Sequence, residues 1–263
     1  MQIDHLRSSS VGTFKNCSFQ FYLDYVCGLY APGFSTKTFI GSALHWLAEQ
    51  LAIQKKDGTY DPNSEHSSVE RLANIAWNEQ VRINSHLEFT KADRKMYDKL
   101  VHTLITNKYN PLNFNIKAVE KQFEIELDLP GFGDPPCMLR GTIDLIIDID
   151  GETIGINDYK TGLRNDWITG LPKELEHFQK DIQFRIYNLA AKTIYPEYKY
   201  RIFTIYYLKD GGPYTVGFDD HDLEDTIDSL RRYYNQMRAD ISPKRIKDNK
   251  LRYKEHFKCK YVC

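Results

Sequence analysis

The chain has 263 residues, of which 41% are hydrophobic, so it can bury a sizeable core as one large domain or as a core with a helical insertion. Its 35 Lys and Arg residues almost balance its 36 Asp and Glu residues, which argues against a protein that coats nucleic acid but allows a local basic channel. No segment approaches the roughly 18 consecutive apolar residues of a membrane span, and the start, MQIDHLRSSS, lacks the apolar core of a secretory signal. We therefore expect a soluble cytoplasmic protein without a membrane partner.

The first half of the chain has the apolar spacing of helices. Ser8 to Ser10 can cap the first helix, and a loop around Pro32 and Gly33 separates it from the second. The second helix has an apolar face with His45 on its flank, and Pro111 stops the last helix of this half. The four helices are expected at about residues 8–26, 36–54, 69–77 and 92–109.

From about residue 119 the apolar residues recur at every second position, as they do in strands. Three consecutive strands, of which the last two are joined by a turn at Asp150 and Gly151, predict a β-meander. A helix, a further strand, a hairpin turn at Gly211 and Gly212 and a final helix follow, and this order predicts an α/β sandwich. The strands are expected at residues 119–129, 138–149, 153–159 and 201–208, and the two helices at about 174–194 and 223–237.

The stretch GTIDLIIDIDGETIGINDYKTG, residues 141–162, is the most informative about chemistry. It places Asp144 in one strand, Asp158 at the end of the next, and Lys160 two residues further on. Because residues i and i+2 of a strand point to the same face, Asp158 and Lys160 project together while Tyr159 points away. A tight turn between the two strands can bring Asp144 beside Asp158.

Two carboxylates brought that close repel each other unless a cation lies between them. Hard oxygen ligands suit Mg²⁺ or Mn²⁺, which can polarise a phosphodiester and acidify a bound water, while Lys160 orients that water or stabilises developing negative charge. The pattern indicates a hydrolytic phosphodiesterase site. A bare Asp-x-Lys is also compatible with solvated turn residues, but an unpaired Asp144 inside an apolar strand would be expensive, which favours a functional role.

Five segments, in order, resemble the RecB-type branch of the PD-(D/E)XK nucleases, which includes the CRISPR-associated adaptation exonucleases and bacterial recombination nucleases. The family has an N-terminal Cys-x-x-x-(Phe/Tyr) signature, a Gly-x-x-x-His helix, a Gly-x-x-Asp motif, an Asp-x-Lys motif and a Gln-x-x-x-Tyr helix. The resemblance spans most of the chain and implies a restriction-endonuclease-like core, with a central mixed β-sheet flanked by helices and an N-terminal helical region. The matching residues are Cys17, Gly41 and His45, Gly141 and Asp144, Asp158 and Lys160, and Gln183 and Tyr187.

The resemblance also implies a role for each matched residue. Lys160 would be the catalytic lysine, and Gln183 and Tyr187, four residues apart and so on one helix face, would position the lysine or the DNA strand. Glu120 begins the strand before Asp144, and we expect it to be structural. The metal ligands that the resemblance implies, for Mg²⁺ or Mn²⁺, are His45, Asp144, Asp158 and the backbone carbonyl of Tyr159.

Many members of this family carry one N-terminal and three C-terminal cysteines that hold an iron–sulfur cluster. Cys17 fits the first position, but the C-terminal HFKCKYVC supplies only Cys259 and Cys263, with His256 where a cysteine would be expected. A Cys₃His set suits a structural Zn²⁺, while a 4Fe-4S cluster with one histidine ligand and free thiols without metal are the alternatives. The remaining cysteines are expected to be spare or buried thiols, Cys27 and Cys137.

No internal repeat or low-complexity linker divides the chain, so we expect a single nuclease domain over residues 1–263. It would contain a helical region at about 1–112, a catalytic α/β core at about 113–240 and a C-terminal metal-clasp segment at about 241–263. The leading hypothesis is an exonuclease that acts on DNA ends or single strands, because the helical first half could cover the active site. A structure-specific or nonspecific endonuclease and an inactive DNA-binding subunit are the alternatives. Recombination, replication or CRISPR-adaptation proteins are candidate partners.

Overall fold

The computed structural model describes residue 3 and residues 5–29, 35–64, 68–127, 136–165 and 170–239. The strands form one six-stranded sheet: β1 His5–Leu6, β2 Ile116–Leu127, β3 Cys137–Asp148, β4 Thr153–Lys160, β5 Tyr200–Tyr207 and β6 Gly211–Phe218. Two pairs, β1 with β3 and β4 with β5, are parallel, and the other pairs are antiparallel. The sheet is therefore mixed, and the predicted meander is its β2–β3–β4 part.

The helices lie close to their predicted positions, with two differences. The first expected helix is divided at Cys17, whose backbone is extended (φ −161°, ψ 109°) and whose sulfur accepts a hydrogen bond from the Gln20 amide. The helix expected over 174–194 is also divided, because Asp181 is extended and caps a new helix by accepting from the Gln183 amide at 2.9 Å.

In the described part of the chain, no helix has the length and apolar character needed to cross a membrane. The helices are α1 Ser8–Asn16, α2 Ser18–Phe21, the π-helical η1 Tyr22–Val26, α3 Thr36–Lys56, α4 Val69–Ile83, α5 Lys91–Thr106, the 3₁₀ turn η2 Pro111–Asn113, α6 Leu175–Gln179, α7 Ile182–Ile194 and α8 Asp220–Ala239.

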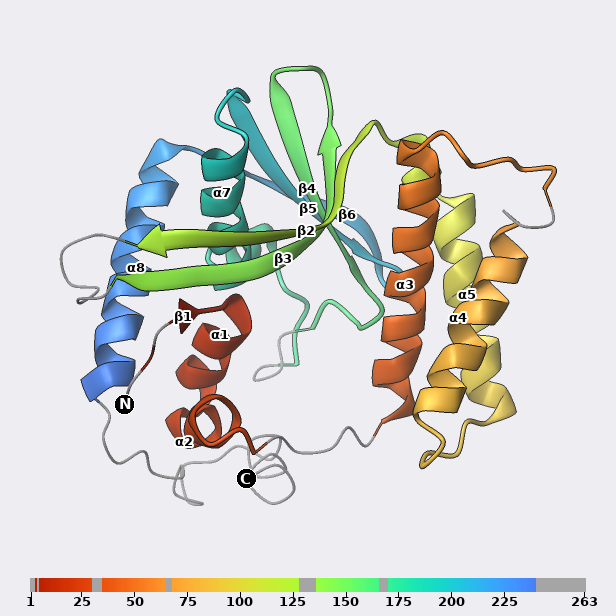
Figure 1. Ribbon diagram of the computed structural model, residues 1–263, viewed down its shortest axis with the longest axis horizontal. Coiled ribbons are helices and arrows are strands. Elements are labelled where there is room, and N and C mark those ends of the chain that lie inside the picture. Colours follow the sequence, from red (N-terminus) through yellow and green to blue (C-terminus); the bar gives the residue numbers. More distant parts are fainter. Residues whose placement is uncertain are drawn as a thin grey trace.

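Helices cover both faces of the sheet (Figure 1). One layer consists of α3, α4 and α5, and its core takes Leu145, Tyr159 and Tyr206 from the sheet. The other layer contains α1, α7 and α8, and its core takes Ile156 and Phe203 from the opposite face. The predicted α/β class, with a mixed sheet flanked by helices and a helical N-terminal region, is confirmed.

Strand β3 is paired unevenly along its two edges. Strand β2 occupies one edge from Cys137 to Ile147. The other edge therefore takes both remaining partners: β1 pairs with Met138 and Leu139, and β4 pairs from Leu145 onward. Among the described residues, 140–144 have no strand partner on this second edge. We call this interval the β3 gap, and Asp144 lies at its end.

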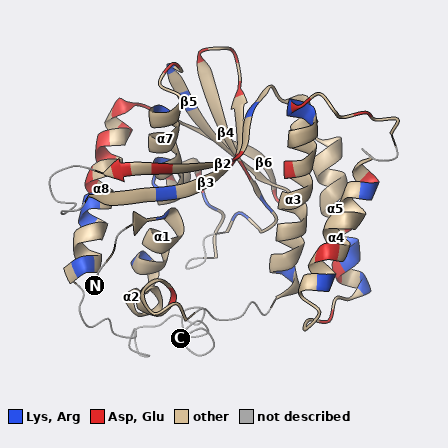
Figure 2. Ribbon diagram, viewed as in Figure 1, with Lys and Arg blue, Asp and Glu red and all other residues tan. Residues whose placement is uncertain are grey.

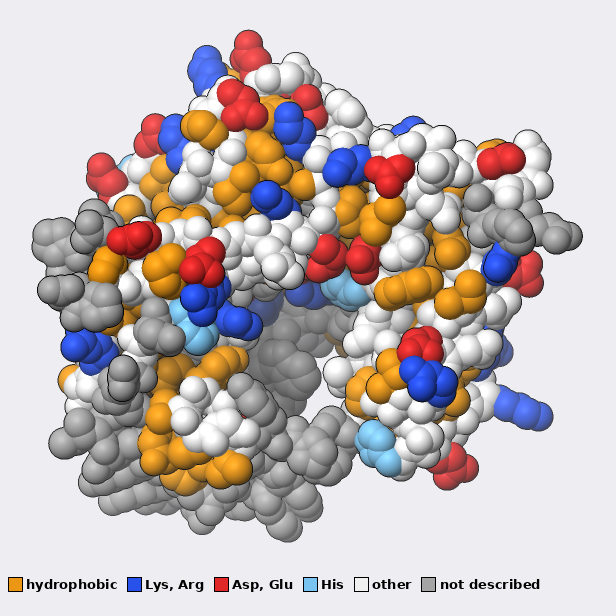
Figure 3. Space-filling model, viewed as in Figure 1, with side chains coloured by type: hydrophobic (Ala, Val, Ile, Leu, Met, Phe, Trp, Pro, Cys, Tyr) orange, Lys and Arg blue, Asp and Glu red, His pale blue; other side chains and the backbone are white. Residues whose placement is uncertain are grey.

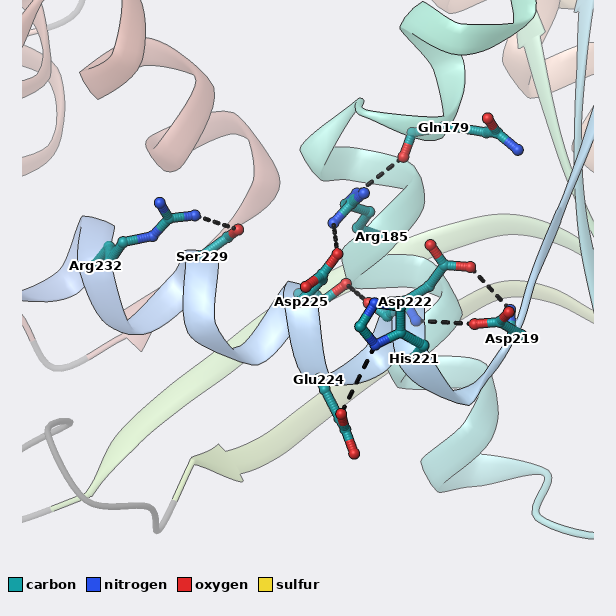
Figure 4. A network of polar contacts seen from close by, with 10 residues as sticks. Gln179, Arg185, Asp219, His221, Asp222, Glu224, Asp225, Ser229 and Arg232 are labelled. Carbon is teal, nitrogen blue, oxygen red and sulfur yellow. Dashed lines mark hydrogen bonds and ion pairs between the residues drawn. The ribbon is translucent and has the colours of Figure 1, made fainter.

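A polar network joins α6, α7 and α8 on the outside of the second layer (Figure 4). Arg185 of α7 donates to the Gln179 carbonyl at 2.9 Å and lies 4.0 Å from Asp225 of α8. Asp219 and Asp222 exchange hydrogen bonds between their side chains and backbone amides, which caps the start of α8. None of the site residues expected from the sequence takes part, so we interpret this network as helix packing.

Candidate active site

The candidate site lies where the pairing of β3 and β4 stops. The two strands pair at Leu145 and Asn157, and the residues that follow in the same register are Asp144 and Asp158. The strands separate at this point, so both acids lie at the end of the β3 gap. The two acids that the sequence predicts to lie side by side are thus found where the hydrogen-bond ladder between β3 and β4 ends.

His45 approaches the first acid from α3. Its Nδ1 lies 3.2 Å from Asp144 Oδ2, and the two side chains are 34% and 24% exposed. Burial by itself lowers the pKa of His45, but the hydrogen bond and charge of Asp144, helped by the charge of Asp158, outweigh burial and raise it. Asp144 therefore stabilises the protonated form of His45.

Asp158 and Lys160 form an ion pair at the end of β4. Lys160 Nζ lies 2.9 Å from Oδ1 and 2.8 Å from Oδ2 of the Asp158 carboxylate, which is almost fully buried. Burial lowers the pKa of Lys160, but the charge and hydrogen bond of Asp158 outweigh it and raise the pKa above its ordinary value. Lys160 is therefore a cation at neutral pH, and its side chain remains partly exposed.

Tyr187 of α7 lies near both acids, and Gln183 of the same helix contacts Tyr187. Gln183 Nε2 donates to the Tyr187 hydroxyl at 3.2 Å. Burial raises the pKa of Tyr187 to about 12, and the charges of Asp144 and Asp158 add to this rise. Tyr187 is thus a neutral hydroxyl beside the two acids. Because Asp181 caps the start of α7, Gln183 lies in the first turn of this helix and Tyr187 lies one turn further on.

Tyr159 faces away from Asp158 and Lys160, as strand alternation predicts. Its hydroxyl donates to the Tyr109 carbonyl at 2.7 Å, and its ring stacks on Tyr206 with the centroids 5.3 Å apart. These contacts fix the side chain in the core of the α3 layer. The ligand role expected for Tyr159 therefore concerns its backbone carbonyl.

Glu49 is a neighbour of the site that the sequence analysis missed. It lies in a small pocket, and burial, with the charge of Asp144, raises its pKa. The sequence does indicate Glu49, because this residue follows His45 by four positions and so lies on the same face of α3. The pocket is lined by His45, Ala48, Glu49, Ala52, Glu120, Asp144, Leu145 and Tyr159.

Glu120 also lines this pocket. Its neighbours Val119 and Lys121 pair with Leu145 and Ile143, which places Glu120 opposite Asp144. Burial raises the pKa of Glu120 to about 7, and the charges of Asp144 and then Glu49 contribute to the rise. The sequence alone suggested a structural residue, since the strand register that brings Glu120 to the site is not visible in it.

Gly141 keeps the strand beside Asp144 free of a side chain. A Cβ at this position would lie 2.5 Å from Phe123 Cζ, so the ring of Phe123 occupies the space that a larger residue would need. Phe123 in turn packs edge-to-face on Tyr187, with the centroids 6.2 Å apart. The glycine of the Gly-x-x-Asp motif thus supports the aromatic contact that holds Tyr187 near the acids.

The donor set of the site suits a hard divalent cation. Asp144, Asp158, Glu49 and Glu120 supply carboxylate oxygens, and burial with mutual repulsion raises the pKa of Glu49 and Glu120. In the described ranges, no three His, Cys, Asp or Glu side chains already stand close enough together to hold a metal ion. The donors therefore suit a divalent cation in chemistry and charge. In this structure Lys160 contacts Asp158 and His45 contacts Asp144.

The candidate site is accessible from one face of the molecule (Figure 3). Acidic and histidine side chains gather beside α3, at the edge of a hollow that separates α3 from α1 and α2 in this view. The side chains of His45 and Lys160 are 34% and 37% exposed. A substrate could therefore reach His45, Lys160 and the partly exposed Asp144 from solvent, while Asp158 is almost fully buried.

The predicted C-terminal metal clasp lies mostly outside the described residues. His256, Cys259 and Cys263 fall in that part of the chain, and only Cys17 is described. Cys17 is a partly exposed free thiol that caps α2. The choice between zinc, an iron–sulfur cluster and no metal remains a prediction.

Comparison with known proteins places the chain in a family. Residues 6–263 match the sequence profile of the PD-(D/E)XK nuclease superfamily. Because the match covers nearly the whole chain, the protein belongs to the PD-(D/E)XK nuclease superfamily. It is therefore a nuclease by family, in the class of hydrolases that act on nucleic acid.

The fold is also similar to that of a solved structure. The crystal structure described as "Putative exonuclease" from Eubacterium rectale superimposes with a TM-score of 0.57 and 13% sequence identity, covering 94% of this chain and 86% of that chain. At this identity the similarity shows the fold alone. No curated protein gave a match.

Proposed function

We propose that this protein is a Mg²⁺- or Mn²⁺-dependent deoxyribonuclease of the RecB type that acts as an exonuclease on DNA ends or single strands. One observation carries the proposal: His45, Asp144, Asp158 and Lys160 converge where the β3–β4 pairing stops. We call Asp144, Asp158, Glu49 and Glu120 the acid cluster. Such a cluster with an adjacent lysine is the arrangement that metal-assisted phosphodiester hydrolysis needs.

The ligands proposed for the metal are Asp144, Asp158, the Tyr159 carbonyl and His45, which would bind in its neutral form after losing its proton. Hard oxygen donors predominate in this set, which suits Mg²⁺ or Mn²⁺. When bound, an ion of this kind polarises a phosphoryl oxygen and acidifies a coordinated water. Asp144 and Asp158 would balance its charge, which would relieve the repulsion within the acid cluster.

Lys160 supplies the positive charge that the chain itself brings to the reaction. Its raised pKa keeps the ammonium group protonated, and its partial exposure lets it donate to a phosphate oxygen or to the attacking water. Tyr187, with a pKa of about 12, stays neutral and can donate its hydroxyl hydrogen while it accepts from Gln183. We assign Gln183 and Tyr187 to positioning of the lysine or of the DNA strand.

The direct test is hydrolysis of end-labelled single- and double-stranded DNA by the purified full chain, with Mg²⁺, Mn²⁺ or EDTA. We expect mononucleotides or short products from linear DNA with metal and none with EDTA. Cleavage of closed circular DNA would instead identify an endonuclease on the same fold. Binding of DNA without cleavage under every metal condition would identify an inactive DNA-binding subunit.

Two substitutions test the residue roles. We expect Asp158→Ala to abolish metal-dependent hydrolysis, because it removes a proposed metal ligand. Lys160→Ala should lower hydrolysis by about 10²-fold or more, because it removes positive charge beside the reacting phosphate. Both proteins should remain folded by circular dichroism. Glu124→Gln is a matched control on β2, since Glu124 forms an exposed ion pair with Arg140, and its activity should be unchanged. Full activity of Asp158→Ala would refute the mechanism.

A further inference from the structure

One face of α3 changes charge along its length. Lys37, Gly41, His45 and Glu49 are each four residues apart, so they follow one face of the helix. In Figure 2, α3 carries basic residues at its ends and an acidic residue between them. Glu49 shares its pocket with Glu120. A phosphate near His45 therefore meets negative charge towards Glu49 and positive charge towards Lys37.

Gly41 brings this face of α3 against the end of β4. A Cβ on Gly41 would lie 3.1 Å from Thr161 Oγ1. Thr161 directly follows Lys160, whose carbonyl accepts a hydrogen bond from the Leu208 amide at 2.9 Å. The start of α3, the end of β4 and the end of β5 thus meet at one junction beside the candidate active site.

Two exposed lysines flank this junction. Lys37 lies one helical turn before Gly41, and Lys209 directly follows Leu208. Burial, together with the charge of Lys37, lowers the pKa of Lys209, as expected when two cations lie near each other. Within the described ranges, neither lysine forms an ion pair.

The acids next to these lysines are engaged in other contacts. Asp93 accepts hydrogen bonds from Thr36 and from both the hydroxyl and the amide of Thr90. Asp210 accepts from the Arg164 amide at 3.0 Å. Asp93 stays charged and interacts electrostatically with Lys37, but within the described ranges neither acid forms an ion pair with these lysines. The two exposed ammonium groups are therefore open to an anionic ligand.

We propose that Lys37 and Lys209 bind a phosphate of the DNA strand other than the one hydrolysed, so that the strand runs from the acid cluster along the N-terminal half of α3. This inference rests on the proposed function, because it takes the acid cluster as the reacting site. Glu49 disfavours the opposite path along α3 for a polyanion. Lys37 lies about 12 Å along the helix from His45, at 1.5 Å per residue, which separates this contact from the reacting group.

The test is binding of a fluorescein-labelled 20-nucleotide single-stranded DNA to the full chain, followed by anisotropy, with Ca²⁺ in place of Mg²⁺. We expect Lys37→Ala/Lys209→Ala to bind about tenfold more weakly at 0.1 M KCl and to reduce the slope of log affinity against log salt by about 1.4, because each lost phosphate contact contributes about 0.7. Lys37→Arg/Lys209→Arg should keep most of the affinity, since the charge is retained.

Lys55→Ala/Lys56→Ala is the matched control, because these exposed lysines lie at the opposite end of the same helix. It should bind as the wild type does. Methylphosphonate substitutions placed singly along the oligonucleotide then locate the contact: one neutralised phosphate should weaken binding by the wild type but not by the Lys37/Lys209 variant.

Unchanged affinity and salt slope in the Lys37/Lys209 variant would overturn the inference, as would an equal loss in the Lys55/Lys56 control. If the wild type still cleaves DNA with Mg²⁺ in either case, the proposed function stands. If the wild type neither binds nor cleaves DNA, the proposed function fails and this inference fails with it. Equal thermal midpoints of the wild type and its three variants will show that a binding loss does not come from unfolding.

Discussion

Glu120 has a backbone φ of 45° inside strand β2. Residues other than glycine rarely adopt this conformation in a strand, and it costs about 1–3 kcal/mol unless the surroundings hold it in place. The same residue lies opposite Asp144 and has a pKa of about 7, because burial and the charges of Asp144 and Glu49 disfavour its ionised form. Glu120 combines backbone strain with a raised pKa, so we expect it to have a functional role in the candidate active site.

The pH dependence of stability tests this expectation. The folded pKa of Glu120, about 7, exceeds its ordinary value of 4.5, so the folded protein holds the proton more tightly than the unfolded chain does. This contribution to stability is complete below pH 4.5 and is lost as the pH rises through about 7. The raised pKa of His45 acts in the same direction. We expect the thermal midpoint of the metal-free protein in EDTA to fall over this range.

Glu120→Gln should make that fall shallower, because glutamine has no proton to lose. The control is Glu124→Gln on the same strand, whose exposed carboxylate pairs with Arg140, and its profile should follow the wild type. A Glu120→Gln profile that is as steep as the wild-type profile would show that Glu120 does not carry this effect.

Some residues of the candidate site can be predicted from the sequence and others cannot. Asp158 and Lys160 could be paired from the sequence, because the period of a strand fixes which side chains share a face. Glu49 could have been found from its spacing to His45, since helical period is equally local. Glu120 could not, because its neighbourhood depends on the register of β2 on β3.

At the scale of elements, the pairing of β2 with β3 holds residues of the candidate site in position. Phe123 of β2 lies across Gly141 of β3 and reaches Tyr187 of α7, so it links three elements. A side chain at position 141 would collide with a buried ring that has a partner on its other side. The glycine of the Gly-x-x-Asp motif therefore has a packing role.

We expect Gly141→Ala to lower the free energy of unfolding by about 1–3 kcal/mol, because the added Cβ overpacks the site against Phe123. Chemical denaturation measures this loss. Gly217→Ala is the matched control, since Gly217 also lies in a strand and a Cβ there would meet no atom within 4 Å. Equal effects at the two positions would contradict the packing explanation.

A double-mutant cycle sharpens the same prediction. Phe123→Ala removes the ring that a Cβ at position 141 would strike, at its own cost of about 3–5 kcal/mol. The Gly141→Ala change should then cost little when made in the Phe123→Ala background, with a coupling energy of about 0.5–3 kcal/mol. Additive effects would show that the two positions do not share one space.

Most elements could be predicted because their periodicity is long, and most failures are short or local. Strand β6 was not predicted, because its sequence shows little alternation, and the hairpin turn expected at Gly211 and Gly212 lies at residues 208–210 instead. The break between α6 and α7 depends on one residue, Asp181, whose side chain caps a helix start inside an otherwise continuous apolar pattern. The break at Cys17 depends on one extended residue. Strand β1 has only two residues, too few to show any period.

At the scale of the whole molecule, the sheet separates two hydrophobic cores and contributes to both. Leu145 and Ile147 face the α3 layer, while Ile143 and Ile146 of the same strand face the α7 layer. Because neither layer can lose the sheet without exposing its core, we propose that the chain behaves as a single domain.

A single domain should unfold in one transition, seen alike by probes in both layers. In a Trp167→Phe background, tryptophan fluorescence reports on Trp46 and Trp77 of the α3 layer. Peptide-resolved alkylation of the buried Cys137 reports on the α7 layer. We expect the two probes to give the same urea midpoint, and separate midpoints would divide the chain into two units.

Metal binding should be visible in the stability of the whole protein. The proposed ligands come from α3 and from the sheet, so a bound ion would tie the helical layer to the strands. We expect Mg²⁺ at about 100 times its dissociation constant to add about 2.7 kcal/mol to the free energy of unfolding. Asp144→Asn should lose most of this gain, and an equal gain in that variant would exclude Asp144 as a ligand.

The two residues of β1 lie on the same edge of β3 as the gap that holds Asp144. Their pairing with Met138 and Leu139 shields backbone groups that would otherwise be free to pair with another chain. Deleting residues 1–7 would join this exposed stretch to the gap and leave a longer open edge on the strand that carries Asp144. A shortened protein could then form edge-to-edge dimers across its own active site, so loss of activity on truncation would first have to be separated from self-association.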